Sequence, residues 1–241
     1  MTAPLPGWTF RAGRPEDAAA CAPLILASGV REFGFFLGAA PEAMTAFLAT
    51  AFASARGRFS WRRHRVAIAP DGRIAGVLAA HDGRLTGLDD PHVAWLLLRV
   101  FGPPHTVAAL LRGLVLEGEL PAPKRAQTHV AHCAIDERWR GTGVFTVLFE
   151  DARRAGVLAD GEGSEVVLDV LLSNPRAAAL YRRLGFVEQP RAKPVSRKLP
   201  AELESLRMRL GRRAPGLLSV RPAGRTHLEV KVLYTPDKGK C

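Results

Sequence analysis

The sequence is poor in cysteine, in aromatic residues and in acidic residues. Its 241 residues include three cysteines, and aromatic residues make up 7% of the chain. Cys21, Cys133 and Cys241 are far apart and form no C-x-x-C pair, which argues against a disulfide framework and a zinc cluster. We therefore expect a reducing cytoplasm, no metal, and an interior filled mainly by Leu, Val and Ala.

Long hydrophobic runs are also missing. The longest apolar stretch, residues 93–116, is interrupted by two arginines, two prolines and a histidine, whereas a membrane span needs about 20 mostly apolar residues. The first residues hold no basic segment that leads into an apolar run, so they do not resemble a secretory signal. The sequence therefore predicts a cytoplasmic protein with no membrane partner.

Positive charge is in excess, because the chain has 34 Lys and Arg residues and 23 Asp and Glu residues, a net charge of +11. Hydrophobic residues make up 47% and charged residues 24%, which is ordinary globular usage and excludes a chain too polar to bury a core. A basic surface attracts anions such as nucleic acid, acidic lipid or a phosphorylated cofactor. Composition does not choose among these partners.

The order of apolar patterns predicts a mixed α/β fold, with strands and helices alternating in the centre of the chain. We expect strands at residues 8–11, 59–69, 74–81, 128–135, 165–172, 186–189 and 227–234. Helices are expected at residues 15–26, 41–54, 144–158, 174–184 and 201–210, with a Phe-rich connector at 31–38.

We interpret residues 1–241 as a single domain whose core comprises 8–82 and 127–234. Residues 84–126 are expected to form a helical insertion, because neither of the two helix-like stretches there offers a core by itself. Residues 190–225 are interpreted as an Arg- and Pro-rich insertion, and residues 235–241 as a loose tail.

A glycine turn between a strand and a helix is the first chemical motif. Arg140, Gly141, Thr142 and Gly143 stand between the strand at 128–135 and the helix at 144–158. Unpaired N–H groups and the helix dipole make such a turn a phosphate cradle. Thr146 breaks the dinucleotide fingerprint G-x-G-x-x-G, and no G-K-[ST] follows a triphosphate frame. The turn indicates either another diphosphate or a plain helix start.

A second motif follows the next strand, running from Asn174 to Phe186 with the sequence NPRAAALYRRLGF. Together with RGTGVF at 140–145, it resembles the GNAT superfamily of acyl-CoA-dependent N-acetyltransferases. The turn is similar to the family's [Q/R]-x-x-G-x-[G/A], and the second motif is similar to N-x-x-A-x-x-L-Y-x-x-x-G-F at every fixed position. The resemblance covers residues 8–82 and 127–190, with a last strand near 227–234.

The resemblance implies a mixed central sheet that is splayed between its fourth and fifth strands, flanked by helices. It implies that acetyl-CoA is the acyl donor, its pantetheine arm on the main chain of Cys133, Ala134 and Ile135. Its diphosphate would lie on the turn formed by Arg140, Gly141, Thr142, Gly143, Val144 and Phe145, with Asn174 close by. Phe145 departs from the family, which prefers a small residue there; a large side chain could crowd the diphosphate or point into the core.

Acid and base chemistry is assigned in the same way. Tyr181 matches the family's tyrosine, which protonates the departing sulfur; outside the motif, it would be a core tyrosine. His129 is our candidate general base, because a histidine titrates near pH ~6.5, with a purely structural histidine as the alternative. We expect His129 and His132 to face opposite sides of their strand, with His129 sharing a face with Cys133. Cys133 is either a buried apolar residue or a rival acylated nucleophile.

Substrate and partner expectations complete the hypothesis. Phe35, Phe36 and His132 are candidates for binding the acceptor, which is a small-molecule or protein amine, and a homodimer is expected. The alternative class is a degenerate transferase fold that binds CoA, RNA or a ribosome through its arginine clusters, although no recognition helix or RNA-binding motif supports nucleic acid. A serine hydrolase is excluded, because no G-x-S-x-G elbow exists.

Overall fold

A seven-stranded sheet organises the part of the chain that the computed structural model describes, residues 5–86, 89–158, 164–191 and 195–211. The strand order is β1-β2-β3-β4-β5-β7-β6. All neighbouring strands are antiparallel except β4 and β5, which are parallel. The strands are β1 (Thr9–Ala12), β2 (His64–Ile68), β3 (Ile74–Asp82), β4 (Gln127–Ile135), β5 (Glu165–Leu171), β6 (Phe186–Glu188) and β7 (Ser205–Leu210).

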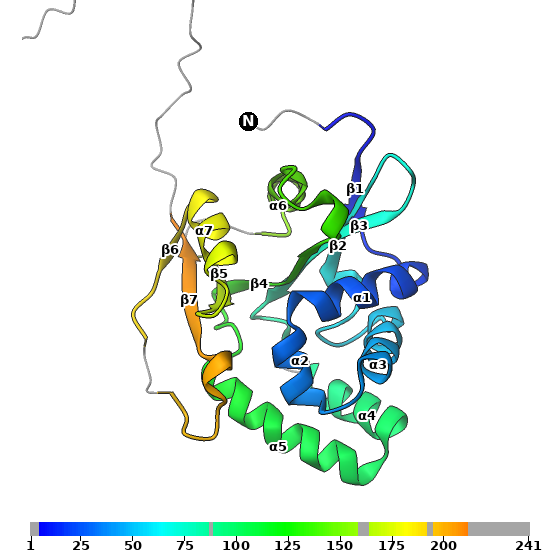
Figure 1. The fold of residues 1–241 in the computed structure, drawn as a ribbon, viewed down its shortest axis with the longest axis vertical. Helices are drawn as coiled ribbons and strands as arrows, with labels where there is room; N and C mark the ends of the chain where they lie inside the picture. Colours follow the sequence, from blue (N-terminus) through cyan, green and yellow to red (C-terminus); the bar gives the residue numbers. More distant parts are fainter. Residues whose placement is uncertain (1–4, 87–88, 159–163, 192–194, 212–241) are drawn as a thin grey trace, which may run out of the picture. The chain divides into compact units, whose positions relative to one another are not determined.

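Helices cover both faces of this sheet (Figure 1). We call the side packed by helices from the first half of the chain the α1 face; it holds α1 (Ala18–Ser28), α2 (Val30–Leu37), α3 (Pro41–Ala53), α4 (Asp89–Phe101) and α5 (Pro103–Glu119). The α6 face holds α6 (Val144–Arg154) and α7 (Pro175–Arg183). The expected α/β class, a mixed sheet flanked by helices, is confirmed.

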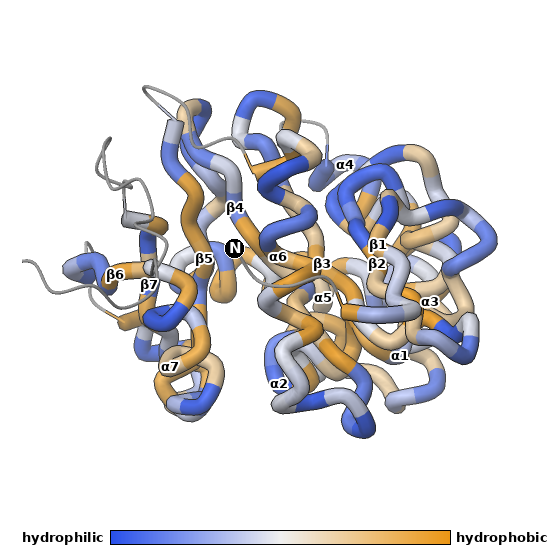
Figure 2. Tube along the Cα trace, turned by 90° about the horizontal axis from the view of Figure 1, so that it is seen from above, coloured by the Kyte–Doolittle hydropathy of each residue, from blue (hydrophilic) through white to orange (hydrophobic). Residues whose placement is uncertain are grey.

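Two hydrophobic cores follow from the alternation of side chains along the central strands. Val66 and Val77 point to the α1 face, where they pack with α1, α3 and α4. Their neighbours Ala67 and Leu78 point to the α6 face and meet Leu148 of α6. Figure 2 shows the resulting hydrophobic stretches along β3, β4 and β5, with hydrophilic segments in the outer turns. Both faces of the central strands are therefore buried.

Three local expectations are wrong. Residues 31–38, expected as a connector, form most of α2, which ends at Gly38 in the left-handed region (φ 58°). Trp61–Arg63 is a 3₁₀ helix, so β2 begins only at His64. Residues 201–210 are not a helix: a 3₁₀ turn at Ala201–Leu203 leads into β7.

The sequence of β7 contains a strand pattern that the helical interpretation missed. Leu206, Met208 and Leu210 alternate with Arg207 and Arg209, a period of two that places the apolar side chains in the α6-face core. The two arginines pair with Asp169 and Glu165 of the neighbouring β5. The strand expected at residues 227–234 lies outside the described residues.

The expected helical insertion forms α4 and α5, and α5 is bonded to two other elements. Arg112 donates to the carbonyl oxygens of Phe36 and Leu37 at the end of α2. Glu119, at the end of α5, accepts hydrogen bonds from Arg191 and Ser205. The insertion therefore connects the end of α2 to the start of β7. Among the described residues, no single helix is both long and apolar enough to cross a membrane.

Candidate active site

The parallel strands β4 and β5 separate in the middle of the sheet. They pair only at Gln127–Glu165, Thr128–Val166 and His129–Val167. Beyond these pairs, β4 continues to Ile135 and β5 to Leu171 with no ladder between them. The four β4 residues that follow Val130, residues 131–134, are all partly exposed, whereas Thr128 and Val130 are buried. The expected splay between the fourth and fifth strands is confirmed, and it exposes one side of β4.

The glycine turn lies at the same end of β4 and opens α6. Gly141 and Gly143 have φ angles of 81° and 87°, a left-handed conformation that favours glycine, and a Cβ added at either would meet no atom within 4 Å. The amide N–H groups of residues 141 and 143–146 donate to no group in the described part of the chain. Residues 141–143 are exposed. These amides and the positive end of α6 form a set of donors suited to a diphosphate.

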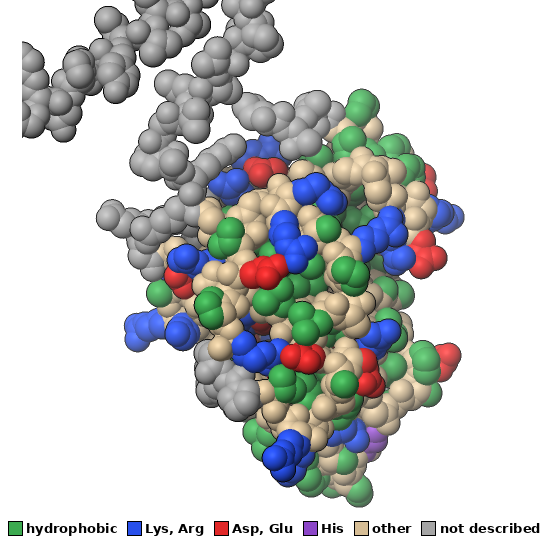
Figure 3. Space-filling view, turned by 60° about the vertical axis from the view of Figure 1, so that its left-hand side comes forward, with side chains coloured by type: hydrophobic (Ala, Val, Ile, Leu, Met, Phe, Trp, Pro, Cys, Tyr) green, Lys and Arg blue, Asp and Glu red, His purple; other side chains and the backbone are tan. Residues whose placement is uncertain are grey.

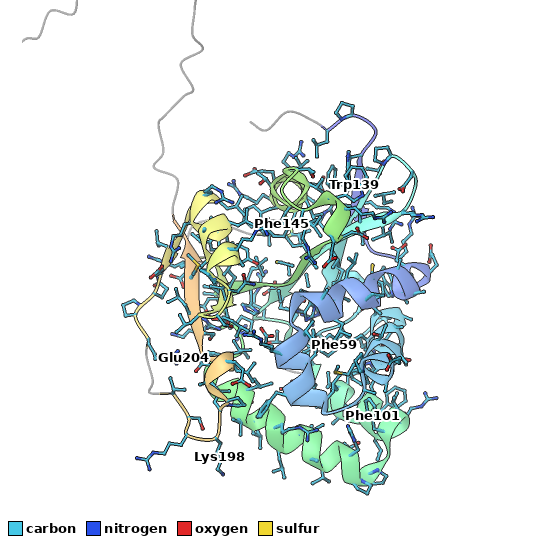
Figure 4. All side chains as sticks on the ribbon, in the orientation of Figure 1. Phe59, Phe101, Trp139, Phe145, Lys198 and Glu204 are labelled. Atoms are coloured by element: carbon cyan, nitrogen blue, oxygen red, sulfur yellow. The ribbon has the colours of Figure 1, made fainter. Side chains whose placement is uncertain are left out.

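Arg140 and Phe145 stabilise this turn in different ways. Arg140 donates from Nε to the carbonyl oxygen of Ile135 at 3.1 Å and from Nη1 to Glu137 at 3.0 Å, so part of its guanidinium holds the turn itself. Phe145 is 9% exposed and packs edge-on against Tyr181. Figure 4 shows Phe145 between α6 and α7. Its ring therefore points into the core and leaves space above the turn.

Tyr181 and Cys133 meet on the α6 face. Burial, followed by the neighbouring Cys133, raises the pKa of the Tyr181 hydroxyl well above its ordinary value. Burial also raises the pKa of the Cys133 thiol to about 12, although the bond from Tyr181 acts in the opposite direction. Both groups are therefore protonated at neutral pH, which suits an acid at Tyr181 and does not suit a nucleophile at Cys133.

Asn174 caps the helix that carries Tyr181. Its Oδ1 accepts a hydrogen bond from the amide of Ala177 at 3.1 Å, and Pro175 occupies the first helical position. This is an N-cap, which satisfies one of the amides that a helix start leaves without a partner. The sequence therefore fixes where α7 begins and, through it, the position of the phenol.

A β-bulge changes which β4 side chains share a face. Ala79 pairs with Ala131 and Val77 with Ala134, so His132 and Cys133 together lie opposite the single residue Leu78. His132 has a φ of 51°, which is uncommon for a residue other than glycine. The expectation from simple alternation is wrong on two points: His129 and His132 both lie on the α1 face, and Cys133 lies on the α6 face.

The bulge gathers four histidines on the α1 face. The His132 ring is 5.2 Å from that of His64 and 5.5 Å from that of His81, and the rings of His81 and His129 are 6.2 Å apart. Burial lowers the pKa of His64 to about 4 and the pKa values of His81 and His132 well below their ordinary range. These three rings are therefore neutral at physiological pH.

His129 differs from the other three because it faces a carboxylate. Its Nε2 lies 3.1 Å from Oδ2 of Asp169 on β5, across the point where the strands separate. Asp169 is also held by two hydrogen bonds from Arg207 of β7, at 2.9 and 2.7 Å. Burial alone would raise the pKa of Asp169, but the bonds from Arg207 and His129 outweigh it and lower that pKa. The imidazole of His129 thus lies against a buried carboxylate that stays ionised.

The phenylalanines of α2 divide between two neighbourhoods. Phe35 and Phe36 pack against the cluster around Leu116 of α5, whereas Phe33 lies with its ring 6.0 Å from that of His132. Phe59 stacks on His132 at 5.2 Å and lies 6.0 Å from Phe33, so the three rings contact one another, on the side of α1, α2 and α3 in Figure 4.

Sequence reasoning missed Phe59, His64, Asp169 and Arg207. One of them carried a signal: Asp169 is the only charged residue inside the apolar run VVLDVLL, and a charge at such a position needs a buried partner. In the described part of the chain, no group of three or more His, Cys, Asp or Glu residues could hold a metal ion.

Comparisons with known proteins agree with this geometry. The model of the acetyltransferase (GNAT) family matches residues 38–186, more than half of the chain. An N-acetyltransferase from Staphylococcus aureus superposes with a TM-score of 0.62 at 15% identity, covering 83% of this chain and 99% of that one.

Two further solved structures are similar. One described as an acetyltransferase superposes with a TM-score of 0.57 at 19% identity, covering 83% of this chain and 97% of its own. One from Corynebacterium glutamicum is described as histone acetyltransferase HPA2 and related acetyltransferase. It superposes with a TM-score of 0.55 at 19% identity, covering 87% of this chain and 99% of its own. No curated protein matches the sequence. At these identities, the structures support the fold.

Proposed function

The chain belongs to the GNAT acetyltransferase family, and on that premise we propose that it transfers the acetyl group of acetyl-CoA to a primary amine. The observation that carries the proposal is the set of unpartnered amides at residues 141 and 143–146, beside the open ends of β4 and β5. A diphosphate bound there would place the pantetheine arm along residues 133–135, between the two strands.

The residues fit this donor on chemical grounds. The exposed amides and the start of α6 are suited to hold the diphosphate, with the main chain of Cys133, Ala134 and Ile135 facing the arm. Asn174, at the start of α7, is the further candidate contact. When bound, acetyl-CoA supplies the thioester carbonyl that the amine attacks and the thiol that leaves.

His129 and Tyr181 supply the proton transfers. His129 takes a proton from the incoming ammonium, and Asp169 stabilises the imidazolium that results. As the C–N bond forms and the C–S bond breaks, the Tyr181 hydroxyl gives its proton to the departing sulfur; the second proton of the amine restores the phenol. A main-chain N–H of β4 holds the developing oxyanion, an effect often worth about 10²–10³ in rate.

Two measurements test the proposal. Isothermal titration with CoA and acetyl-CoA is expected to show saturable binding at one site per chain. A thiol-release assay with acetyl-CoA is then run against spermidine, kanamycin, free amino acids and a lysine-containing peptide, and at least one amine is expected to release thiol.

Two other outcomes would contradict the proposal. Saturable CoA binding without thiol release from any amine would favour the degenerate binder. Failure to bind CoA, together with RNA affinity that falls steeply with salt, would favour a nucleic-acid partner.

A further inference from the structure

A chain of hydrogen bonds runs from the backbone to His132. Nδ1 of His64 lies 2.8 Å from the carbonyl oxygen of Ser60, and Nε2 of His64 lies 3.0 Å from Nδ1 of His132. His64 is 1% exposed, so water does not compete for these bonds. The two rings stack with an angle of 10° between their planes. Both rings are thus fixed in position.

This chain determines where the protons are. A carbonyl oxygen only accepts hydrogen bonds, so Nδ1 of His64 carries a proton and donates it in a hydrogen bond to the carbonyl oxygen of Ser60. In a neutral imidazole, the other nitrogen is then an acceptor, which makes Nε2 of His64 the acceptor and Nδ1 of His132 the donor. The lone pair of His132 is consequently on Nε2. One backbone carbonyl sets the tautomer of a ring two hydrogen bonds away.

The Nε2 atom of His132 is available to a ligand. It has no hydrogen-bond partner in the described part of the chain. Nδ1 of His81 also lacks a partner but is fully buried, whereas Nε2 of His132 is not among the fully buried atoms. His132 follows the last β4–β5 pair and lies on the α1 face, whereas its neighbour Cys133 faces Tyr181 on the other side. The lone pair and the phenol therefore flank the same short stretch of β4.

His132 and His129 are suited to different tasks. Burial, and then the charges of His64 and His129, keep the pKa of His132 low, so its ring stays neutral and accepts a hydrogen bond without taking a proton. His129 has the Asp169 carboxylate beside it, which stabilises a protonated ring. The neutral ring packs against Phe33 and Phe59 and adds no positive charge that would repel an ammonium.

We propose that His132 orients the acceptor by accepting a hydrogen bond from its N–H at Nε2, and that His64 is the positioning residue that locks this tautomer. The inference rests on the proposed amine acetylation and adds a specificity rule to it. An amine that can donate an N–H to Nε2 of His132 is bound in the right orientation. A neutral tertiary amine has no N–H, so it cannot form this hydrogen bond and is not oriented toward the thioester. Ser60 contributes only its carbonyl oxygen.

The tautomer is measured directly, without any substrate. ¹⁵N-histidine NMR of the free protein at about pH 7.5 is expected to show His132 with a protonated Nδ1 and an unprotonated Nε2. His64→Leu removes the acceptor for that proton and is expected to give a mixture of tautomers. His64→Gln places an amide oxygen near the position of Nε2 and is expected to keep the single tautomer. A wild-type His132 with its proton on Nε2 would overturn the proposal.

Kinetics with an amine that releases thiol then tests the role in binding. His64→Leu is expected to raise KM for the amine about tenfold, with His64→Gln closer to wild type and the affinity for CoA unchanged in both. His92→Leu, on α4 outside the cluster, is the matched control and is expected to leave KM unchanged. His132→Gln, which keeps an acceptor but cannot titrate, is expected to change KM for the amine more than kcat.

Three results would overturn the inference. If His64→Leu changes the tautomer but not KM, the lock does not orient the amine. If His132→Gln abolishes kcat, His132 is a base rather than an acceptor. If the wild-type protein binds CoA but releases no thiol with any amine, the proposed function fails and the substrate role of His132 fails with it, while the NMR spectrum still decides whether the lock exists.

Discussion

At the scale of a single residue, the Tyr181 hydroxyl combines a position and a protonation state. It lies on α7, whose start is fixed by the Asn174 cap, and its raised pKa keeps it protonated well into the alkaline range. A general acid must hold its proton when the reaction begins, and the raised pKa ensures that the Tyr181 hydroxyl does so at neutral pH. The pKa therefore suits an acid rather than a base.

Tyr181→Phe removes the proton and keeps the ring that packs against Phe145 and Phe186. We expect kcat for thiol release to fall roughly 10²–10⁴-fold, the usual contribution of a positioned acid or base. The dissociation constant for CoA is expected to stay within a factor of two or so, because the phenol does not touch the diphosphate site. Steady-state kinetics and calorimetry on the same preparation check both; an unchanged kcat would remove Tyr181 from the mechanism.

Residues that belong to local motifs could be predicted, and residues brought together by the sheet could not. Asn174, Tyr181 and the glycine turn each lie within a short segment whose spacing carries the information. By contrast, Asp169 and Arg207 are 38 positions apart and meet only because β5 and β7 are neighbours. The shared face of His129 and His132 depends on a bulge, which a strict period of two does not foresee.

At the scale of an element, the start of α6 is a set of exposed donors that no side chain caps. Its function depends on the backbone conformation of Gly143, since φ 87° is strained for any residue with a Cβ. The chain offers a matched position in Gly72, in the β2–β3 turn, with φ 80° and equally open surroundings. The two glycines differ in place and not in local geometry.

Gly143→Val is expected to abolish detectable CoA binding, because a branched side chain would occupy the space over the amides and shift them. Gly72→Val carries the same backbone strain, roughly 1–2 kcal/mol, and is expected to bind CoA as the wild type does. Isothermal titration of both variants, with thermal unfolding to compare their stability, separates the two effects. Equal CoA affinity in Gly143→Val and the wild type would show that the turn is not the diphosphate site.

Helix α5 raises a second question at this scale, namely whether the insertion is part of the domain. Glu119 has a side chain only 3% exposed and accepts four hydrogen bonds, two from Arg191 and two from Ser205. Burial alone would raise the pKa of Glu119, but these bonds lower it overall. The carboxylate is therefore a fixed link between α5 and β7.

Glu119→Gln leaves these donors with a neutral partner of the same shape. We expect the free energy of unfolding to fall by about 1–3 kcal/mol, toward the low end because Arg191 is 35% exposed and can be hydrated. Glu117→Gln, on the exposed side of the same helix, is the control and is expected to change it by less than about 0.5 kcal/mol. Urea unfolding checks both; a separate transition for the insertion would show that it folds independently.

Element boundaries were predicted where hydrophobic period and turn chemistry agreed. The strand from residue 74, the buried run of β5 and the start of α6 all appear where expected. The segments that failed, α2 and β7, each have a pattern that is short and ambiguous, and each is held by partners distant in sequence: Arg112 for α2, and Asp169 with Glu119 for β7. Tertiary contacts decided those two elements.

At the scale of the whole molecule, the basic side chains on one face are spread out rather than concentrated. On the face that Figure 3 shows, Lys and Arg side chains are separated by hydrophobic and acidic ones. Several arginines are engaged in ion pairs within the fold, among them Arg11 with Asp17, Arg65 with Asp151 and Arg207 with Asp169. Some of the 34 Lys and Arg residues therefore serve internal pairing, and the net charge of +11 is the excess that such pairs do not offset.

Burial of neutral histidines links the stability of the whole fold to pH. His64, His81 and His132 have pKa values lowered by burial, His64 to about 4 from 6.5. In the unfolded chain, the same rings bind protons below about pH 6.5. As pH falls from about 6.5 toward 4, the unfolded state binds protons that the folded state does not bind, so the free energy of unfolding decreases.

The hydrogen-bonded carboxylates with lowered pKa values act in a lower pH window than the buried histidines. Asp17, Asp169 and Glu119 have lowered pKa values, so their stabilisation is lost only as pH falls below the ordinary carboxyl values of 3.8 and 4.5. Above about pH 5, these three carboxylates add little to the slope of stability against pH, whereas Glu32 and Asp89, whose pKa values burial raises, act against the slope of the buried rings. For His64 alone, the shift to about 4 corresponds to roughly 3 kcal/mol between pH 6.5 and 4, at about 1.36 kcal/mol per unit.

Urea unfolding at about pH 7.5, 6.5, 5.8 and 5.2 is expected to show the free energy of unfolding falling across this range in the wild type. His64→Gln cannot titrate and is expected to have a shallower slope, even if its stability at pH 7.5 is lower, because the slope depends on proton uptake and not on packing. His92→Gln, on α4, is expected to keep the wild-type slope. A His64→Gln slope equal to that of the wild type would mean that His64 titrates alike in both states, and that the ring is not held neutral by the fold.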